Sequence, residues 1–406
     1  MPTPSELAAI SQPTREAEPP TPPGVTATEE KGQSPRSQDG PRGASLGSWE
    51  GLAQPSGDDQ PSAMMPPGQI LSPLLLLLLV PCPAAPCSPH PNATRFVCTE
   101  PTLSTFPSGL PPTTLAISVE FTALAAMVPT ALAGLPRLQE LHLSSNRLAA
   151  LPETLLRPVP TLRVLDLTNN LLATLPADIF ATTRHLQHLV LRENRLRALK
   201  PAWFRHLPRL LWLDLGDNAL TEVPPEVFHP LGSLRSLDLS HNSLVSLAPG
   251  VLAGLRALER LDLEGNRLGT LSPATFAPTP TLRLLFLQDN QLQALPAGIF
   301  VPLRNLSVLD LARNRLRVLE LPPQPPGPAL DLDISGNPWD CGCQLVALLR
   351  RVTPRLTAAR DTVCASPPRH RGQEVATVVQ AGDTGCEPRG DMQHLPDPKT
   401  RGLVSP

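Results

Sequence analysis

The chain has 406 residues, of which 74 are leucine and 53 are proline, about 13 % against an average near 5 %. It contains no tyrosine and only 3 % aromatic residues, which excludes a core built on large aromatic side chains. The formal net charge is −2, from 34 basic and 36 acidic residues, and this balance argues against a nucleic-acid-binding protein, which normally carries a basic excess.

Two segments precede the first candidate folded region. Residues 1–63 are rich in proline and polar residues and poor in apolar ones, so we predict disorder there. Residues 64–84 begin with two methionines and contain a short apolar run, Leu74–Val80, which fits a secretory signal peptide better than a membrane span. We expect initiation at one of these methionines and cleavage after Ala84. Residues 1–63 would then be an artefact of the gene model; a genuine long leader or an uncleaved anchor is the alternative.

Residues 85–114 form the predicted N-terminal cap. All seven cysteines lie outside the central part of the chain, and loss of Cys82 with the signal peptide would leave six. An even number of cysteines in an oxidising compartment indicates disulfides, so we expect Cys87 to pair with Cys98 and close this cap.

Residues 115–337 contain a regular repeat. Eight asparagines recur at intervals of 24 residues, each in the frame L-x-x-L-x-L-x-x-N-x-L-x-x-L, which is the leucine-rich repeat pattern. An irregular unit with Thr122 at the asparagine position precedes them, and another ends at Asn337 after a spacing of 23. The eight regular asparagines are Asn146, Asn170, Asn194, Asn218, Asn242, Asn266, Asn290 and Asn314.

The spacing of the repeat predicts its structure. The L-x-L core has the period of a short strand, and strands of successive units should pair in parallel. The asparagine amide should bond to backbone groups where the chain leaves the strand. We therefore predict an α/β solenoid, a curved leucine-rich repeat horseshoe with a parallel concave sheet and disulfide-closed caps at both ends. A second apolar position should form a stacked spine beneath the convex side: Leu156, Phe180, Phe204, Phe228, Leu252, Phe276 and Phe300.

The exposed alternate positions of the strands should form two lanes on the concave face. One lane is acidic, which indicates a surface for a basic partner or a cation, or simply reflects how common L-D-L is in such repeats. The acidic lane consists of His142, Asp166, Val190, Asp214, Asp238, Asp262, Phe286, Asp310 and Asp333. The adjacent lane contains Val164, Trp212, Leu284 and Val308.

Large apolar side chains that face solvent mark contact sites, although they can also pack on neighbouring exposed side chains. We therefore predict a protein-binding concave face. Its candidate contact residues are Trp212, Phe286, Asp214, Asp238, Asp262, Asp310 and Arg192.

Residues 338–386 form the predicted C-terminal cap. Leu345, Leu348, Leu349 and Val352 recur at helical spacing and predict an amphipathic capping helix. The four cysteines of this cap allow three disulfide pairings. A zinc site from Cys341, Cys343, Cys364 and His370 is the alternative, which secretion and the even cysteine count disfavour. The cap also contains six arginines, which indicate either a binding site for an anion or simply a solvated face. They are Arg350, Arg351, Arg355, Arg360, Arg369 and Arg371.

Three stretches carry a more specific resemblance: Leu138–Asn146, Leu156–Thr168 and Asp333–Trp339. Here, and from about residue 87 to 386, the chain resembles the leucine-rich alpha-2-glycoprotein family. The resemblance implies a secreted, glycosylated, non-enzymatic protein that modulates transforming growth factor-beta signalling at endothelial receptors, with a role in vessel growth. It also implies the disulfides Cys341–Cys364 and Cys343–Cys386.

Three short motifs lie outside this framework. The sequons at Asn92 and Asn305 are candidate N-glycosylation sites. Residues 387–406 form a predicted disordered tail that contains Arg389-Gly390-Asp391, a tripeptide that resembles integrin-binding loops but is short enough to arise by chance.

A secreted binding module explains the signal, the caps, the sequons and the repeat together. An extracellular-matrix structural protein of the small proteoglycan type is the alternative, although many of those carry a different N-terminal cysteine cluster. No catalytic motif is present, so we expect no enzyme, no cofactor and no metal. No second spanning apolar run follows the repeats. We expect a secreted monomer that binds extracellular proteins, by resemblance a transforming growth factor-beta ligand, receptor or co-receptor, and neither nucleic acid nor membrane.

Overall fold

The structure is a computed structural model that describes residues 87–89, 94–322, 330–351, 355–357 and 361–381. Several predicted features lie outside the described residues: the leader 1–63, the signal peptide 64–84, Asn92, Cys386 and the tail 387–406 with its Arg389-Gly390-Asp391 tripeptide.

Thirteen short strands form one continuous sheet whose strand order follows the chain, except that β14 follows β12 directly. β1 is antiparallel to β2, and every other neighbouring pair is parallel. The strands are β1 (Ser88–Pro89), β2 (Arg95–Cys98), β3 (Ala116–Val119), β4 (Glu140–His142), β5 (Val164–Asp166), β6 (His188–Val190), β7 (Trp212–Asp214), β8 (Ser236–Asp238), β9 (Arg260–Asp262), β10 (Leu284–Phe286), β11 (Val308–Asp310), β12 (Asp331–Asp333) and β14 (Arg355–Thr357).

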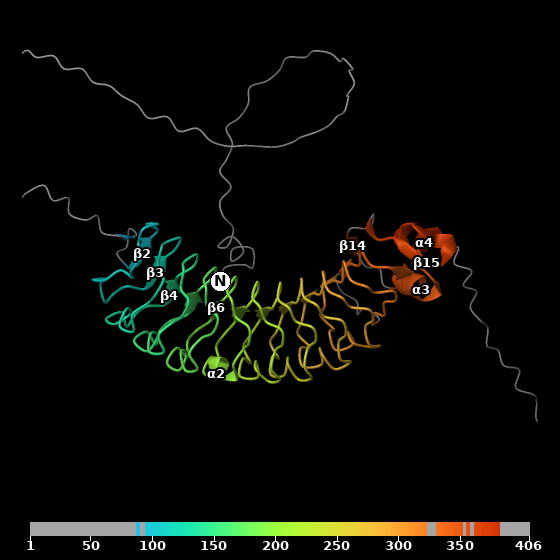
Figure 1. Ribbon diagram of the computed structural model, residues 1–406. Helices are drawn as coiled ribbons and strands as arrows, with labels where there is room; N and C mark the ends of the chain where they lie inside the picture. The colour runs from blue at the N-terminus through green and yellow to red at the C-terminus, as the bar shows by residue number, and fades with distance from the viewer. Residues whose placement is uncertain (1–86, 90–93, 323–329, 352–354, 358–360, 382–406) are drawn as a thin grey trace, which may run out of the picture. The chain divides into compact units, whose positions relative to one another are not determined.

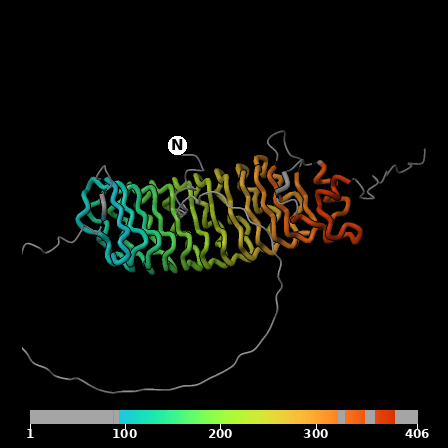
Figure 2. Tube along the Cα trace, turned by 90° about the horizontal axis from the view of Figure 1, so that it is seen from above, coloured from blue at the N-terminus to red at the C-terminus, as the bar shows by residue number. Residues whose placement is uncertain are grey.

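Each coil of the chain adds one strand to this sheet. From β3 to β11 the register joins each residue to the residue 24 positions further on, as in Leu141 beside Leu165, whereas β2–β3 and β11–β12 are offset by 21 and 23 residues. The central leucines of the strands are buried, because the strand period turns them away from the concave surface. Figure 1 shows the strands along the inner side of the curved array, and Figure 2 shows the coils following one another in chain order. The predicted leucine-rich repeat solenoid is confirmed.

The asparagines form a buried ladder that joins neighbouring coils. The Nδ2 atom of Asn242 donates hydrogen bonds to the carbonyl oxygens of Leu215 (3.0 Å), Leu239 (3.1 Å) and Ser240 (3.0 Å). Its Oδ1 atom accepts one from the N–H of Leu220 at 3.0 Å. Each asparagine side chain therefore hydrogen-bonds to backbone groups of its own turn and of the preceding coil. These backbone groups are buried and need such partners.

Thr122 ends this ladder at the N-terminal side. Its hydroxyl donates to Oδ1 of Asn146 at 2.6 Å and accepts from the N–H of Leu124 at 3.3 Å. A threonine therefore stands in place of the asparagine where no preceding regular coil needs the two bonds that a ladder asparagine gives it.

The convex side is filled by the predicted aromatic spine. Phe204 and Phe228 have ring centroids 5.7 Å apart, and Phe276 and Phe300 have theirs 6.2 Å apart. Trp203, in the short helix α2 (Pro201–Phe204), is also buried and donates its indole N–H to a backbone carbonyl. Bulky rings on this side and three-residue strands on the other are consistent with the curvature of the array.

A disulfide lies at each end of the described chain. Cys87 is bonded to Cys98 beside the first strands, and Cys341 is bonded to Cys364 beyond the last coil. Cys343 is also disulfide-bonded, and its expected partner lies outside the described residues. Because Cys341 and Cys364 bond to each other, they do not form the alternative zinc site.

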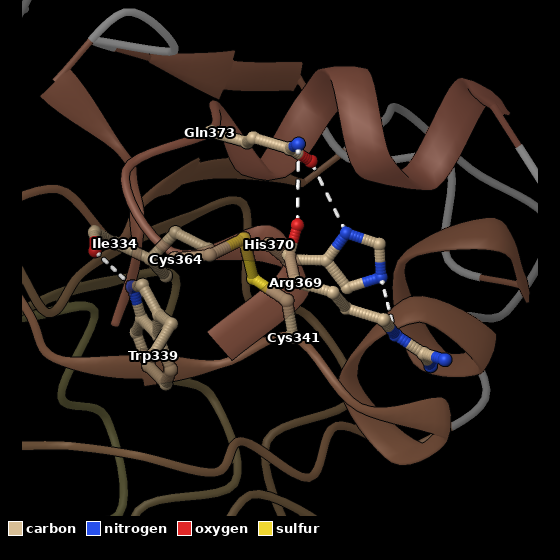
Figure 3. Close-up of a disulfide and its surroundings, with 7 residues drawn as sticks. All are labelled: Ile334, Trp339, Cys341, Cys364, Arg369, His370 and Gln373. Atoms are coloured by element: carbon tan, nitrogen blue, oxygen red, sulfur yellow. Dashed lines mark hydrogen bonds between the residues drawn. A yellow bond between two sulfur atoms is a disulfide. The ribbon is translucent and has the colours of Figure 1, made fainter. Parts of the chain in front are cut away.

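The C-terminal cap packs on the last coil. It contains β13 (Trp339–Asp340), which pairs with β15 (Cys364–Ser366), and the helices α3 (Cys343–Arg351), η3 (Pro368–His370) and α4 (Val375–Ala381). Trp339 is fully buried and donates its indole N–H to the carbonyl of Ile334 at 2.6 Å, while His370 pairs with Gln373 at 3.1 Å (Figure 3). The predicted capping helix is α3, which buries Leu345, Val346 and Leu349.

One strand of the sheet was not predicted from the sequence. Arg355–Thr357 was expected to belong to the cap, yet it forms β14 and pairs in parallel with β12. The sheet therefore continues one strand beyond the last repeat. None of the described helices has the length and apolar character needed to cross a bilayer.

Candidate functional site

The strand register gathers the predicted contact residues on the middle coils of the concave face. Asp214, Asp238, Asp262 and Phe286 stand side by side in one lane. Trp212, Ser236, Arg260 and Leu284 stand side by side in the next. We call the set made of Trp212, Asp214, Ser236, Asp238, Arg260, Asp262 and Phe286 the central concave patch.

The lane aspartates hold the turns that follow their strands. Oδ1 of Asp214 accepts the N–H of Gly216 at 2.9 Å, and Oδ1 of Asp238 accepts the N–H of Ser240 at 2.8 Å. Asp310 makes the same bond to Ala312 at 2.9 Å. The aspartate of L-D-L therefore has a structural role in each coil, which accounts for its recurrence without a ligand.

Two of these carboxyl groups are more buried than predicted. Asp214 and Asp262 were expected to face solvent, but only 9 % and 5 % of their surfaces are exposed. Burial, reinforced by the charge of Asp238, raises the pKa of Asp214 to about 7 and that of Asp262 to about 6. Adjacent coils place the carboxyl groups of this lane one strand apart, where their negative charges repel one another. Asp214 and Asp262 therefore take up protons near neutral pH.

Arg192 enters the patch from the neighbouring coil. Its guanidinium pairs with Asp217 and lies 3.7 Å from Oδ2 of Asp238. It passes over Gly216, where an added Cβ would lie 2.6 Å from Nη1 of the arginine. Glycine at that position therefore lets the arginine reach the acidic lane.

Arg260 joins the acidic and aromatic parts of the patch. Its Nη2 lies 2.7 Å from Oδ2 of Asp262, and its guanidinium carbon lies 4.3 Å from the ring centroid of Phe286. The sequence reasoning missed this residue. Its position two residues before Asp262 in the same strand, and therefore on the same face, is the signal that predicts the contact.

Trp212 and Phe286 are half-buried, whereas the sequence analysis expected them to be exposed. Among the residues that the structure describes, none accepts a hydrogen bond from the indole N–H of Trp212. Ser236, between Trp212 and Arg260, is only 5 % exposed and its hydroxyl has no partner in the described chain. The floor of the patch thus holds one buried hydroxyl that the fold leaves unsatisfied, beside an indole N–H that stays accessible.

Phe121 is an exposed aromatic residue outside the patch, and it was not predicted from the sequence. It is 68 % exposed and has a positive φ of 56°. It directly precedes Thr122, at the position where the other coils also have a left-handed residue before their asparagine. That position points its side chain outward, which is the signal that identifies Phe121.

The other predicted residues lie away from the patch. Asn305 is exposed, in the turn before β11. Arg350 donates two hydrogen bonds to the carbonyl of Val379 and so joins α3 to α4. Arg369 donates to His370, and Arg371 is exposed. The side chains of Arg351, Arg355 and Arg360 are outside the description of the structure.

Asp214 gives the fold a testable pH dependence. Its pKa of about 7 in the folded protein lies above the value of 3.8 for a free aspartate, so the folded state retains a proton that the unfolded chain releases. The stability that the retained proton adds to the folded state is fully present below about pH 4 and is lost as the pH rises through about 7. Asp214→Asn keeps the acceptor for Gly216 without the charge. We expect the variant to melt several degrees above the wild type at pH 8, since 1 kcal/mol shifts the melting temperature by roughly 2–4 °C. At pH 4 the variant and the wild type should melt at the same temperature.

The control for this experiment is Asp331→Asn, which removes an exposed carboxylate on β12. It should leave the melting temperature unchanged at both pH values. A shift of the same size at pH 4 and pH 8 in Asp214→Asn would contradict the titration of Asp214.

Comparison with known proteins agrees with this architecture. The leucine rich repeat family model matches residues 136–193, 160–220, 184–244, 210–268, 233–292 and 280–321. A stretch of 64 residues is 55 % identical to phospholipase A2 inhibitor beta of Elaphe climacophora, and one of the same length is 53 % identical to a phospholipase A2 inhibitor of Gloydius brevicaudus siniticus. Each match covers 15 % of this chain and 19 % of the relative, so the chain matches about a fifth of the length of these relatives.

Two solved structures share the fold. A chain of the Toll–Spatzle complex of Drosophila superposes with a TM-score of 0.57 at 23 % identity, over 70 % of this chain and 44 % of that one. A leucine-rich repeat protein of Leptospira interrogans superposes with a TM-score of 0.51 at 27 % identity, over 60 % of this chain and 65 % of that one. Proteins of this kind are typically non-enzymatic scaffolds that bind other proteins. The matched repeats span residues 136–321, where the coils of the structure have the leucine-rich repeat fold.

Proposed function

We propose that this protein is a secreted, non-enzymatic glycoprotein that binds another extracellular protein through the central concave patch. The observation that carries the proposal is the floor of the patch. There the half-buried indole of Trp212, with its N–H unbonded, adjoins the buried and unpartnered hydroxyl of Ser236. The proposal includes a signal peptide at 64–84 and glycosylation at Asn92 and Asn305.

The indole N–H of Trp212 is available to a partner. It donates no hydrogen bond within the described chain and is not a buried atom, so an acceptor on a partner can reach it, whereas the hydroxyl of Ser236 is enclosed by the fold. Tryptophan, tyrosine and arginine are the side chains that most often dominate binding energy, and Trp212 and Arg260 lie on either side of Ser236. The patch therefore has the composition of a binding centre rather than that of a solvated face.

The charge of the patch favours a partner with basic side chains. Asp214, Asp238 and Asp262 outnumber the two arginines that pair with the lane, and one of those, Arg192, also pairs with Asp217. A lysine or arginine of the partner would add a cation where like charges now repel.

The identity of the partner rests on resemblance. The likeness to the leucine-rich alpha-2-glycoprotein family supports a transforming growth factor-beta ligand, receptor or co-receptor, with an effect on vessel growth. The relatives named phospholipase A2 inhibitors support a phospholipase A2 as the second candidate. A structural protein of the extracellular matrix is the remaining alternative, and the accessible indole N–H of Trp212 and the neighbouring Arg260 favour a binding protein over it.

A binding experiment tests the site and the partner together. The secreted protein is titrated by surface plasmon resonance against the receptor ectodomains, the growth factor and a secreted phospholipase A2. We expect Trp212→Ala to weaken the binding by about 30-fold, because truncating a central tryptophan costs about 2 kcal/mol. Val301→Ala removes an exposed apolar side chain outside the strands and serves as the matched control.

Melting curves should show that both variants remain folded. Equal affinity of wild type and Trp212→Ala for every partner that binds would contradict the central concave patch as the binding site.

A further inference from the structure

A second cluster of side chains lies on the first coils of the array, separate from the central concave patch. It contains Glu120, in the turn after β3, His142, at the end of β4, and Asp166, at the end of β5. One ligand atom from each of the three residues lies within 4.8 Å of the other two, and all three residues are half-buried. Val190 stands between this cluster and Asp214 in the lane.

The ligand atoms of the cluster are too far apart for hydrogen bonds and somewhat farther apart than the ligands of a bound metal ion. Nδ1 of His142 lies 3.8 Å from Oδ2 of Asp166, beyond the range of a hydrogen bond. Two ligands of a tetrahedral zinc ion with bonds of 2.0–2.1 Å lie about 3.3 Å apart. A movement of a few tenths of an ångström in each side chain would bring the imidazole and the carboxylate to that separation.

Hydrogen bonds orient both carboxylates. Glu120 accepts the hydroxyl of Ser118 at 2.5 Å on one oxygen and the hydroxyl of Ser144 at 2.7 Å on the other. Oδ1 of Asp166 accepts the N–H and the hydroxyl of Thr168, at 2.9 Å and 2.6 Å. The other oxygen, Oδ2, is the one that faces His142. Outer hydrogen bonds that fix a carboxylate in this way are typical of metal sites.

The charge of the cluster matches a divalent cation. A bound metal ion would displace the proton of His142, and the neutral imidazole with two carboxylates then carries two negative charges. No described arginine or lysine forms an ion pair with Glu120 or Asp166, and the nearby Glu140 is already paired with Arg95 at 2.9 Å. An imidazole with two carboxylates suits zinc, whereas calcium and magnesium prefer oxygen ligands alone.

We propose that Glu120, His142 and Asp166 bind one zinc ion on the concave face, with water in the remaining coordination position. The three ligands come from three successive coils, so the ion clamps the first repeats together. The site does not depend on the proposed function of the central concave patch.

Isothermal titration of the purified full chain, stripped of metal and then titrated with Zn²⁺ alone, tests this proposal. We expect a one-to-one site in the wild type, weakened at least about tenfold by His142→Ala and by Asp166→Asn, because each removes a direct ligand. Glu120→Gln keeps the side-chain shape and should weaken binding as well. Ca²⁺ at the same concentration should not compete.

His241→Ala is the matched control. His241 lies 3.9 Å from a carboxylate oxygen of Glu264, a similar pair that belongs to none of the described three-ligand clusters. It should bind zinc as the wild type does. The proposal is overturned if the wild type shows no zinc site, if His142→Ala, Asp166→Asn and Glu120→Gln bind zinc with unchanged affinity, or if His241→Ala loses as much affinity as His142→Ala. Melting curves without metal identify any variant that fails to fold, and the remaining variants then decide.

Discussion

Replacing Asn242 with alanine is expected to lower the free energy of unfolding by roughly 3–5 kcal/mol. The asparagine makes four hydrogen bonds in the ladder, and all four are buried. Alanine would leave the N–H of Leu220 and the carbonyls of Leu215 and Leu239 short of a partner, at about 1–3 kcal/mol for each group that finds no other bond. The methyl group cannot replace any of these bonds.

Urea denaturation followed by circular dichroism measures this loss. Gln293→Ala is the control, because it removes an exposed amide from the same kind of scaffold and should change the free energy of unfolding by less than about 0.5 kcal/mol. If Asn242→Ala unfolds at the same urea concentration as wild type, the ladder does not stabilise the coils as described.

Replacing Trp339 with alanine is the second large effect, and we expect it to destabilise the protein by roughly 3–5 kcal/mol. The indole is fully buried at the junction of the last coil and the cap, next to the Cys341–Cys364 disulfide, and its N–H serves the carbonyl of Ile334 (Figure 3). Alanine would leave a cavity and an unsatisfied carbonyl at the end of an array that needs its cap.

Two further variants distinguish the effect of losing a buried indole at the cap from the effect of losing a tryptophan elsewhere. Trp339→Phe refills much of the cavity and should recover about half of the loss, leaving the missing N–H bond. Trp212→Ala removes a half-buried indole without a hydrogen bond and should cost less than about 1 kcal/mol. Hydrogen exchange of α3 and α4 should quicken in Trp339→Ala only. Unchanged exchange there would show that Trp339 does not hold the cap.

The sequence was sufficient to predict the solenoid because each of its determinants is local. The L-x-L core determines which side of the strand is buried. The asparagine three residues after the second leucine of this core supplies the hydrogen bonds of the turn. Thr122 and Asn337 were recognised as irregular ends for the same reason. Each coil repeats these instructions, so the assignment of one coil supports that of the next.

The sequence was not sufficient to predict the candidate site in detail. Burial of Asp214 and the partnership of Arg260 with Phe286 depend on side chains that lie 24 or more residues apart in the chain and cross from one coil to another. The lane of a residue follows from the repeat, but its exposure depends on how its neighbours lean. β14 escaped prediction because three residues with a single leucine carry no repeat signal.

The last ladder asparagine shows where the repeat tolerates change in length. Asn337 bonds to Leu311 and Leu316, which precede it by 26 and 21 residues, whereas the regular asparagines bond at separations of 27 and 22. The bonds are the same although the coil is one residue shorter, so the residue is missing from the segment between Leu316 and β12. Insertions and deletions during evolution, or tags added by design, are therefore best tolerated on that segment. A single residue inserted between a strand and its asparagine would instead break the bonds of two coils at once.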